Sequence, residues 1–182
     1  MQTLTQYIKT LDIDILYTSS LRRARQSSNI ISATIGFKAC VDSRLNEINF
    51  GTWEGKTAEQ LLSEKDKSFT SWANGKWRTP TGGESIHSLQ RRAKQFLKQC
   101  LRKHKNQKIG IVSHGGPLRM IILESLQLPL KYLFSFRVDP ASLSVLTFSS
   151  IKSAQILCLN THSKKAGSRR LYGRKATTAF TL

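Results

Sequence analysis

The chain has 182 residues, of which 39% are hydrophobic and 22% charged, a composition that fits one globular domain with a sizeable core. Its formal net charge of +18 at pH 7 indicates an anionic partner, such as nucleic acid, an anionic membrane surface or a phosphorylated small molecule. No apolar run approaches the roughly 18 residues of a membrane span, and no signal peptide is recognisable. Three scattered cysteines argue against a disulfide framework and a zinc site, and favour the cytoplasm.

Helices and strands alternate in the first part of the chain. Residues 2–11 carry apolar side chains at helical spacing and predict an amphipathic helix. Residues 13–17 alternate between apolar and polar and predict a strand, which ends in capping residues before a helix over 21–35. A loop over 37–55 follows. The capping-box pattern of residues 57–60 then predicts a short helix.

The later part of the chain completes an α/β pattern and ends in a basic segment. A long helix is predicted over 84–104, because its apolar residues fall on one face, and late strands over 142–148 and 155–159. Six of the 29 basic residues and none of the 11 acidic ones lie in 163–182, so residues 1–162 alone keep a net charge of +12. We expect one domain over residues 1–162 and a disordered basic tail over 163–182.

One stretch between these elements carries the first candidate for chemistry. Residues 109–112 predict a buried strand that ends at Ser113-His114-Gly115-Gly116, and Pro117 opens the next helix. His114 therefore lies at the carboxyl end of a strand, beside free N–H groups of a helix N-terminus, where α/β sheets bind anionic ligands. A hydrogen-bonded turn histidine without a function would give the same pattern.

Two further segments supply charged candidates. Arg22, Arg23 and Arg25 lie in the first turns of a helix, where cations oppose the helix dipole unless an anion binds there. Arg23 is the best placed to face the sheet, although all three side chains are equally compatible with a solvated surface. Glu47, in the loop over 37–55, is either half of a structural ion pair or a general acid.

Four motifs occur in order and together resemble one family. They are Ser19-x-Leu21-x-Arg23-Ala24-x-Gln26-Ser27, Leu45-x-Glu47-x-x-Phe50-Gly51-x-Trp53-Glu54-Gly55, Gly82-Gly83-Glu84-Ser85 and Val112-Ser113-His114-Gly115. This set resembles the histidine phosphatase superfamily, in its phosphoglycerate mutase-like and α-ribazole phosphatase-like branch. The resemblance covers about residues 3–162.

The resemblance implies a three-layer phosphoglycerate mutase-like sheet flanked by helices and a phosphatase that acts on small phosphorylated substrates through a phosphohistidine. Arg23 would bind the phosphoryl oxygens, helped by a protonated His114 and by the amides near Gly115. Glu47 would protonate the leaving oxygen and later activate water. Neither a cofactor nor a metal is implied.

The sequence departs from the family in its most important residue. The family's nucleophilic histidine lies in an Arg-His-Gly motif after the first strand, and these 182 residues contain no such motif. The resemblance therefore implies an N-terminally truncated domain without its first, central strand, impaired or inactive in hydrolysis. The gap beside the strand of His114 would expose strand edges and invite self-association.

An alternative function remains open. A non-catalytic protein that binds phosphate or a polyanion such as nucleic acid, through the arginines or the basic tail, would explain the charge equally well. No membrane association is expected.

Overall fold

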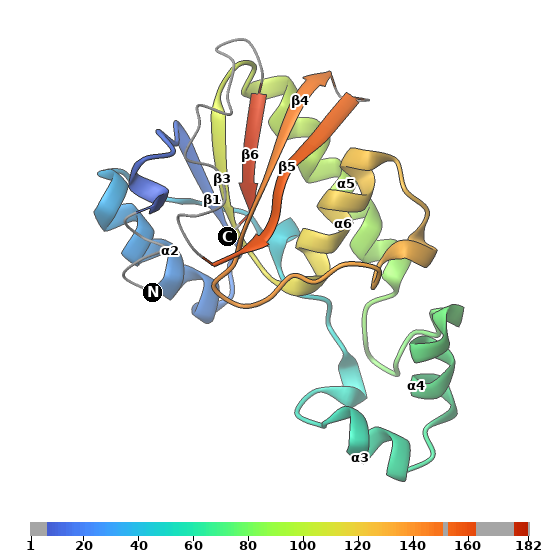
Figure 1. Ribbon diagram of the computed structural model, residues 1–182. Coiled ribbons are helices and arrows are strands. Elements are labelled where there is room, and N and C mark those ends of the chain that lie inside the picture. Colours follow the sequence, from blue (N-terminus) through green and yellow to red (C-terminus); the bar gives the residue numbers. More distant parts are fainter. Residues whose placement is uncertain (1–6, 151–152, 163–176, 182) are drawn as a thin grey trace.

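The computed structural model of the protein describes residues 7–150, 153–162 and 177–181 (Figure 1). Its centre is a six-stranded sheet of order β2-β1-β3-β6-β4-β5. The strands are β1 (Ile15–Thr18), β2 (Cys40–Val41), β3 (Lys108–Val112), β4 (Leu143–Ser150), β5 (Ser153–Thr161) and β6 (Thr177–Thr181). Strands β2, β1, β3 and β6 run parallel, and β4 is antiparallel to both β6 and β5. This sheet confirms the α/β prediction.

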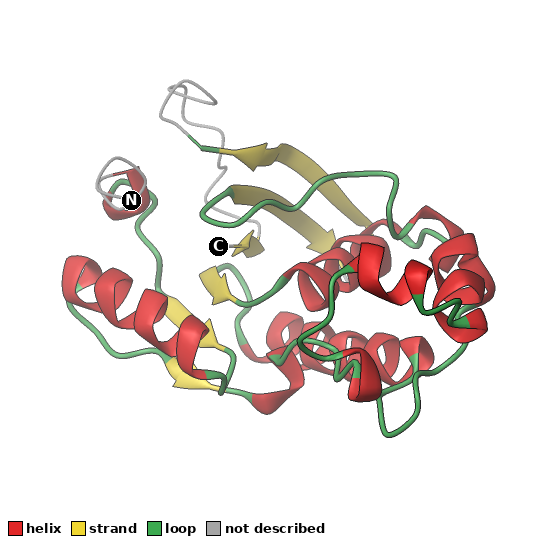
Figure 2. Cartoon of the chain, turned by 90° about the horizontal axis from the view of Figure 1, so that it is seen from below, coloured by secondary structure: helices red, strands yellow, loops and turns green. Residues whose placement is uncertain are grey.

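The helices lie on both sides of the strands, as Figure 2 shows. They are α2 (Arg22–Ile35), α3 (Ala58–Ser63), α4 (Lys67–Ser71), α5 (Ile86–Lys103) and α6 (Gly115–Leu126). The predicted helices over 21–35 and 84–104 are thereby confirmed, and so is the capping box, in which Thr57 and Gln60 bond each other's backbone N–H groups. Of the helix predicted over 2–11, residues 7–9 are helical, and residues 1–6 lie outside the described part.

Two apolar cores make the three-layer arrangement. On one face of the sheet, α5 and α6 pack against Ile109, Ile111 and Leu146. On the other face, residues 7–13 and α2 pack against Leu16 and Val112. Neighbouring residues of β3 thus serve opposite cores, as side chains alternate across a strand. The layers confirm the expected sheet flanked by helices.

The gap expected beside the strand of His114 does not exist in the sheet. Strand β6 lies between β3 and β4 (Figure 1): Ile109 pairs with Ala179 on one side, and Leu146 pairs with it on the other. The edges that were expected to be exposed are therefore paired, because a segment from the end of the sequence supplies the hydrogen bonds. The prediction of a disordered tail over 163–182 is wrong for residues 177–181, and residues 163–176 lie outside the described part.

The loop-rich segment between the second and fifth helices forms an aromatic cluster away from the sheet, at the lower right of Figure 1. Helices α3 and α4 and a π-helical turn, Trp72–Lys76, build it. The rings of Trp53, Trp72, Trp77 and Phe134 make edge and tilted contacts at 5.4–6.1 Å between centroids. Within the described ranges, no helix combines the length and the hydropathy needed to span a bilayer.

Candidate active site

His114 lies at the junction between β3 and α6. It is the N-cap residue of α6, with an extended backbone (φ −135°, ψ 168°), and only 9% of its surface is exposed. The preceding residue, Ser113, donates a 2.7 Å hydrogen bond to the carbonyl oxygen of Leu45 and so joins this junction to the loop of Glu47. The strand–turn–helix prediction is confirmed, with the helix beginning two residues before Pro117.

The hydrogen bonds of His114 define its tautomer. The Nε–H of Arg23 donates to Nδ1 over 3.2 Å, so Nδ1 carries no proton. Nε2 lies 2.8 Å from Oγ of Ser19, and that hydroxyl in turn donates its proton to Oδ1 of Asn46 over 2.9 Å. The hydroxyl of Ser19 therefore accepts a proton from Nε2–H, which makes His114 a neutral imidazole with both ring nitrogens engaged.

The electrostatic surroundings favour the same neutral form. Burial, and then the positive charges of Arg23 and Arg92, lower the pKa of His114 from its usual 6.5 to about 4. Without a ligand, this arrangement therefore favours the neutral form of His114, whereas the resemblance implies a protonated His114 beside a phosphoryl group. The sequence could not show it, because Arg23 and Arg92 come close to His114 only through the fold.

Arg23 extends from the first turn of α2 toward the cavity in front of His114. Arg22, Arg23 and Arg25 are all exposed, but of the three only Arg23 lines this cavity. The first turn of α2 contains no acidic residue and its N-cap makes no side-chain hydrogen bond, so the positive end of the helix faces further positive charge. An anion bound at Arg23 would relieve this repulsion.

Glu47 is held against the first turn of α6. Its carboxylate accepts hydrogen bonds from the N–H of Gly116 (3.1 Å) and from that of Ile48 (3.0 Å). A free helix N–H is a favourable partner for a carboxylate. A Cβ at position 116 would clash with Oε1 of Glu47, so any larger residue there would displace this carboxylate. The structure thus brings Glu47 to the same helix terminus as His114.

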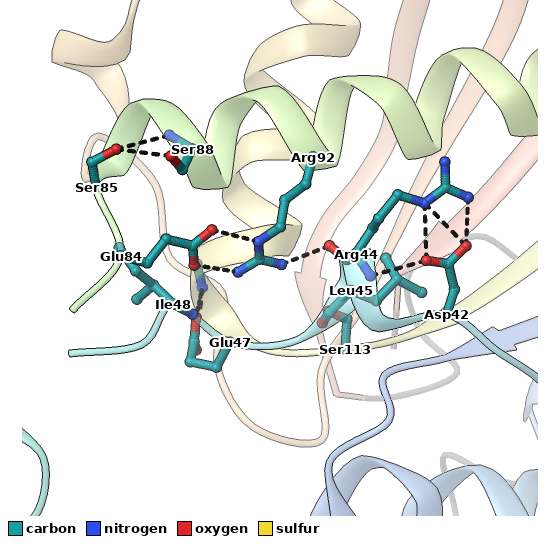
Figure 3. A network of polar contacts seen from close by, with 11 residues as sticks. Asp42, Arg44, Leu45, Glu47, Ile48, Glu84, Ser85, Ser88, Arg92 and Ser113 are labelled. Atoms are coloured by element: carbon teal, nitrogen blue, oxygen red, sulfur yellow. Dashed lines mark hydrogen bonds and ion pairs between the residues drawn. The ribbon is translucent and has the colours of Figure 1, made fainter. Parts of the chain in front are cut away.

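A polar network fixes the loop that carries Glu47 (Figure 3). Arg92 of α5 makes a double ion pair with Glu84, with both N···O distances at 2.8 Å, and donates to the carbonyl oxygen of Arg44 over 2.6 Å. Arg44 itself forms a fork with Asp42. Burial competes with that pair, but the hydrogen bonds of Arg44 dominate and lower the pKa of Asp42. Arg92 was not identified from the sequence, where it is one of several arginines on a helix surface.

Arg23, Glu47 and His114 line a common cavity of about 450 Å³. Its polar lining consists of Arg23, Glu47, His114 and Asp139, together with Ser27, Ser113, Gly115 and Ser142. The remaining wall is mainly apolar and includes Ile8, Ile31, Val112, Leu118 and Val138. An apolar cavity with a few convergent polar groups is typical of small-molecule sites. All four residues predicted from the sequence therefore meet at one place.

The other histidines lie elsewhere. His87 is exposed on α5, His104 is buried against the hydroxyl of Tyr17 (2.8 Å), and Nε2 of His162 lies 3.8 Å from Asp139. Among the described residues, His114 is the only histidine that lines the cavity. Nor do any three His, Cys, Asp or Glu side chains of the described ranges come together as a metal site would require.

The sequence matches one family model and several proteins that are named as phosphatases. The sequence model of the histidine phosphatase superfamily (branch 1) matches residues 1–161. A phosphoserine phosphatase of Hydrogenobacter thermophilus is 30% identical over 158 residues, which cover 86% of this chain and 74% of that protein. The adenosylcobalamin/alpha-ribazole phosphatase of Escherichia coli is 26% identical, over 89% of this chain and 80% of the relative.

A solved structure agrees with these relatives. The alpha-ribazole phosphatase of Shigella flexneri superimposes with a TM-score of 0.73 at 27% identity, over 88% of this chain and 81% of the other. The match to the family covers the sheet up to β5, both flanking layers and every residue of the cavity's polar part. The chain belongs to the histidine phosphatase superfamily (branch 1).

Proposed function

We propose that the chain binds the phosphoryl group of a small phosphomonoester between Arg23, His114 and the first turn of α6. The observation that carries this proposal is the convergence of Arg23, His114 and Glu47 on one cavity at a helix N-terminus. The nitrogens of the Arg23 guanidinium beyond Nε suit a tetrahedral oxyanion, and the N–H of Gly115 adds a helix-terminal donor. The phosphatase names of the relatives agree with this ligand class.

Glu47 is the candidate proton donor for the leaving oxygen. Its carboxylate is held by the N–H groups of Gly116 and Ile48, and it lines the same cavity as Arg23. A carboxyl group in that place can protonate the ester oxygen and later take a proton from water. Transfer to a phosphohistidine would also need a histidine nitrogen with a free lone pair, aimed at phosphorus.

We further propose that hydrolysis by these 182 residues is impaired. Nδ1 of His114 already accepts from Arg23, and Nε2 carries the proton that Ser19 accepts, so neither nitrogen is available as a nucleophile. The sequence holds no Arg-His-Gly motif that would supply another. In this arrangement His114 is therefore unsuited to attacking phosphorus.

Titration calorimetry with inorganic phosphate and a turnover assay with 4-nitrophenyl phosphate, both on the full chain, test the proposal. We expect phosphate to bind, Arg23→Gln to abolish binding, and turnover to be at or near the uncatalysed rate. Arg22→Gln is the matched control, because it removes the same charge from the same helix turn outside the cavity. Absence of phosphate binding would refute the site, and turnover that His114→Ala abolishes would refute the impairment.

Binding of a polyanion such as nucleic acid is a second candidate function. The observation that favours it is the net charge of +18, with six basic residues between 164 and 175, and a groove on α5 lined by Lys98, Arg102 and Lys103. Neutralising those six residues to Gln leaves β6 in place. Affinity for a DNA duplex should then fall and depend less steeply on salt. Absent or salt-independent binding by the unmodified chain would exclude this function.

A further inference from the structure

Arg119 reaches back from the second turn of α6 to Gly115, a residue that lines the cavity. Its Nη1 lies 2.8 Å from the point that a Cβ of Gly115 would occupy, and Oε2 of Glu47 lies 4.0 Å from the same point. Gly115 and Glu47 both line the cavity. The guanidinium of Arg119 therefore borders the place where Glu47 would meet the ester oxygen of a bound phosphomonoester.

The charge of Arg119 has no carboxylate partner among the described residues. Nε–H donates to the carbonyl oxygen of Phe136 over 3.4 Å, and Cζ lies 5.9 Å from the centre of the Phe134 ring. No acceptor within the described ranges is recorded for Nη1 or Nη2, whereas Arg44, Arg92 and Arg137 each form an ion pair. The carboxylates of Glu47 and Asp139 attract this guanidinium without forming an ion pair, so its desolvation cost is only partly offset.

The surroundings of Arg119 keep it in position for a ligand. The carbonyl of Phe136 and the face of Phe134 hold Nε and the guanidinium plane, and so leave the two terminal nitrogens for a further acceptor. Burial lowers the pKa of Arg119, and the carboxylates of Glu47 and Asp139 oppose this effect. The group nevertheless stays charged, since a guanidinium does not lose its proton near neutral pH.

We propose that Arg119 binds a carboxylate on the leaving group of the substrate, which makes the preferred ligand a compact phosphomonoester with a carboxylate a few atoms from the ester oxygen. This inference rests on the proposed phosphoryl site at Arg23 and His114. With the phosphoryl group there and the ester oxygen at Glu47, the leaving group extends past Gly115 toward Arg119. A planar guanidinium binds a carboxylate through two parallel hydrogen bonds, which a neutral or cationic group cannot form.

Calorimetry at constant ionic strength, with inorganic phosphate and three small esters, tests this inference on the full chain. The esters are 2-phosphoglycolate, ethyl phosphate and phosphoethanolamine, which carry a carboxylate, a methyl group and an ammonium group at similar distances from the ester oxygen. We expect 2-phosphoglycolate to bind about tenfold more tightly than ethyl phosphate, as a charge-assisted hydrogen bond provides. In Arg119→Gln this preference should vanish, with phosphate affinity unchanged within about twofold.

Arg137→Gln is the matched control. Arg137 is the residue after Phe136, its side chain is 81% exposed and pairs with Asp139, and its loss removes the same charge from a position that does not itself line the cavity. The preference should survive in this variant. Arg119→Lys, which keeps the charge but not the two parallel donors, should retain only part of the preference. This variant replaces Arg119→Gln in the test if Arg119→Gln fails to fold.

The outcomes separate this inference from the proposed function. If phosphate binds but 2-phosphoglycolate is not preferred, or the preference survives in Arg119→Gln, the role of Arg119 is refuted and the phosphoryl site stands. If phosphate itself does not bind, the proposed function fails and the role of Arg119 fails with it. Equal loss of phosphate and ester binding in Arg119→Gln would assign Arg119 to the structure of the helix terminus instead.

Discussion

The Nε–H of Arg23 donates a hydrogen bond to Nδ1 of His114 over 3.2 Å, although the two residues lie on different helices and 91 positions apart in the sequence. This contact combines the ends of α2 and α6 into one anion site. It also fixes His114 in the neutral form, since a proton on Nδ1 would face the guanidinium directly.

The depressed pKa of His114 predicts a pH-dependent stability. In the unfolded chain the imidazole takes up a proton near pH 6.5, whereas in the folded chain it does so only near pH 4. Between these values the unfolded state binds more protons, so the contribution of His114 to stability is present above pH 6.5 and is lost as pH falls toward 4. In His114→Gln this part of the pH dependence should be absent.

Urea unfolding of both proteins between pH 4 and 7 measures the effect. Carboxylates titrate in the same range, so the relevant quantity is the difference between the two curves, which should change with pH below 6.5 and stay constant above. A constant difference over the whole range would show that His114 has an ordinary pKa in the folded protein.

Because the ion pair between Arg92 and Glu84 helps to hold the loop that carries Glu47, we predict that breaking it weakens ligand binding. Both side chains are largely buried, at 17% and 20% exposure, and Arg92 also holds the carbonyl of Arg44. Arg92→Gln should therefore cost about 1–3 kcal/mol of unfolding free energy, because it leaves Glu84 and that carbonyl without their donor. It should also weaken phosphate binding, since the loop of Glu47 loosens.

Arg91→Gln is the control for that experiment, because Arg91 is the exposed neighbour on the same helix. Denaturant unfolding and calorimetry should show a lower free energy of unfolding and weaker phosphate binding in Arg92→Gln than in Arg91→Gln. Equal stability of Arg91→Gln and Arg92→Gln would mean that the network in Figure 3 contributes nothing to stability.

The sequence predicted that Arg23 and His114 lie at the same edge of the sheet, because each follows the end of a strand and the two strands pair in parallel. It did not identify Asp139, which also lines the cavity. Ile15 pairs with Ile109, and Thr18 with Val112, so both strands end at the same edge. The end of each strand is recognisable from the local sequence pattern. The protonation of His114 was beyond prediction, because the burial and the two arginines responsible arise from tertiary packing.

The position of β6 was beyond prediction for a related reason. Its residues, 177–181, contain three threonines and follow a basic segment, so neither periodicity nor composition separates them from a tail. Their partners in β3 and β4 are far away in the sequence. Pairing of this kind is decided by which strand edges remain available after the rest of the sheet has formed.

The three cysteines should differ strongly in reactivity. Cys40 is exposed, whereas burial raises the pKa of Cys100 to about 12 and also raises that of Cys158. Because the thiolate is the reactive form, a disulfide reagent at pH 8 should modify Cys40 rapidly and the other two slowly. The fast phase should be missing in Cys40→Ser. When the unmodified chain is unfolded in urea, all three thiols should react in the fast phase. Rapid modification of Cys100 in the native protein would contradict its burial.

Strand β6 should stabilise the sheet from its interior position. Ala179 pairs with Ile109 on one side and with Leu146 on the other, so a proline there removes an N–H from a strand that has neighbours on both sides. Ala179→Pro should lower the free energy of unfolding by about 3 kcal/mol or more, while Ala179→Gly, which keeps the N–H, should cost about 1 kcal/mol or less. Urea unfolding of the two variants gives the comparison.

The same substitution should change association. Once β6 detaches, the facing edges of β3 and β4 present unpaired backbone groups that another chain can bind. Ala179→Pro should therefore elute from a gel-filtration column increasingly early as its concentration rises, and Ala179→Gly should elute as the unmodified chain does. If Ala179→Pro matches the unmodified chain in both stability and elution, then β6 is not part of the sheet in solution.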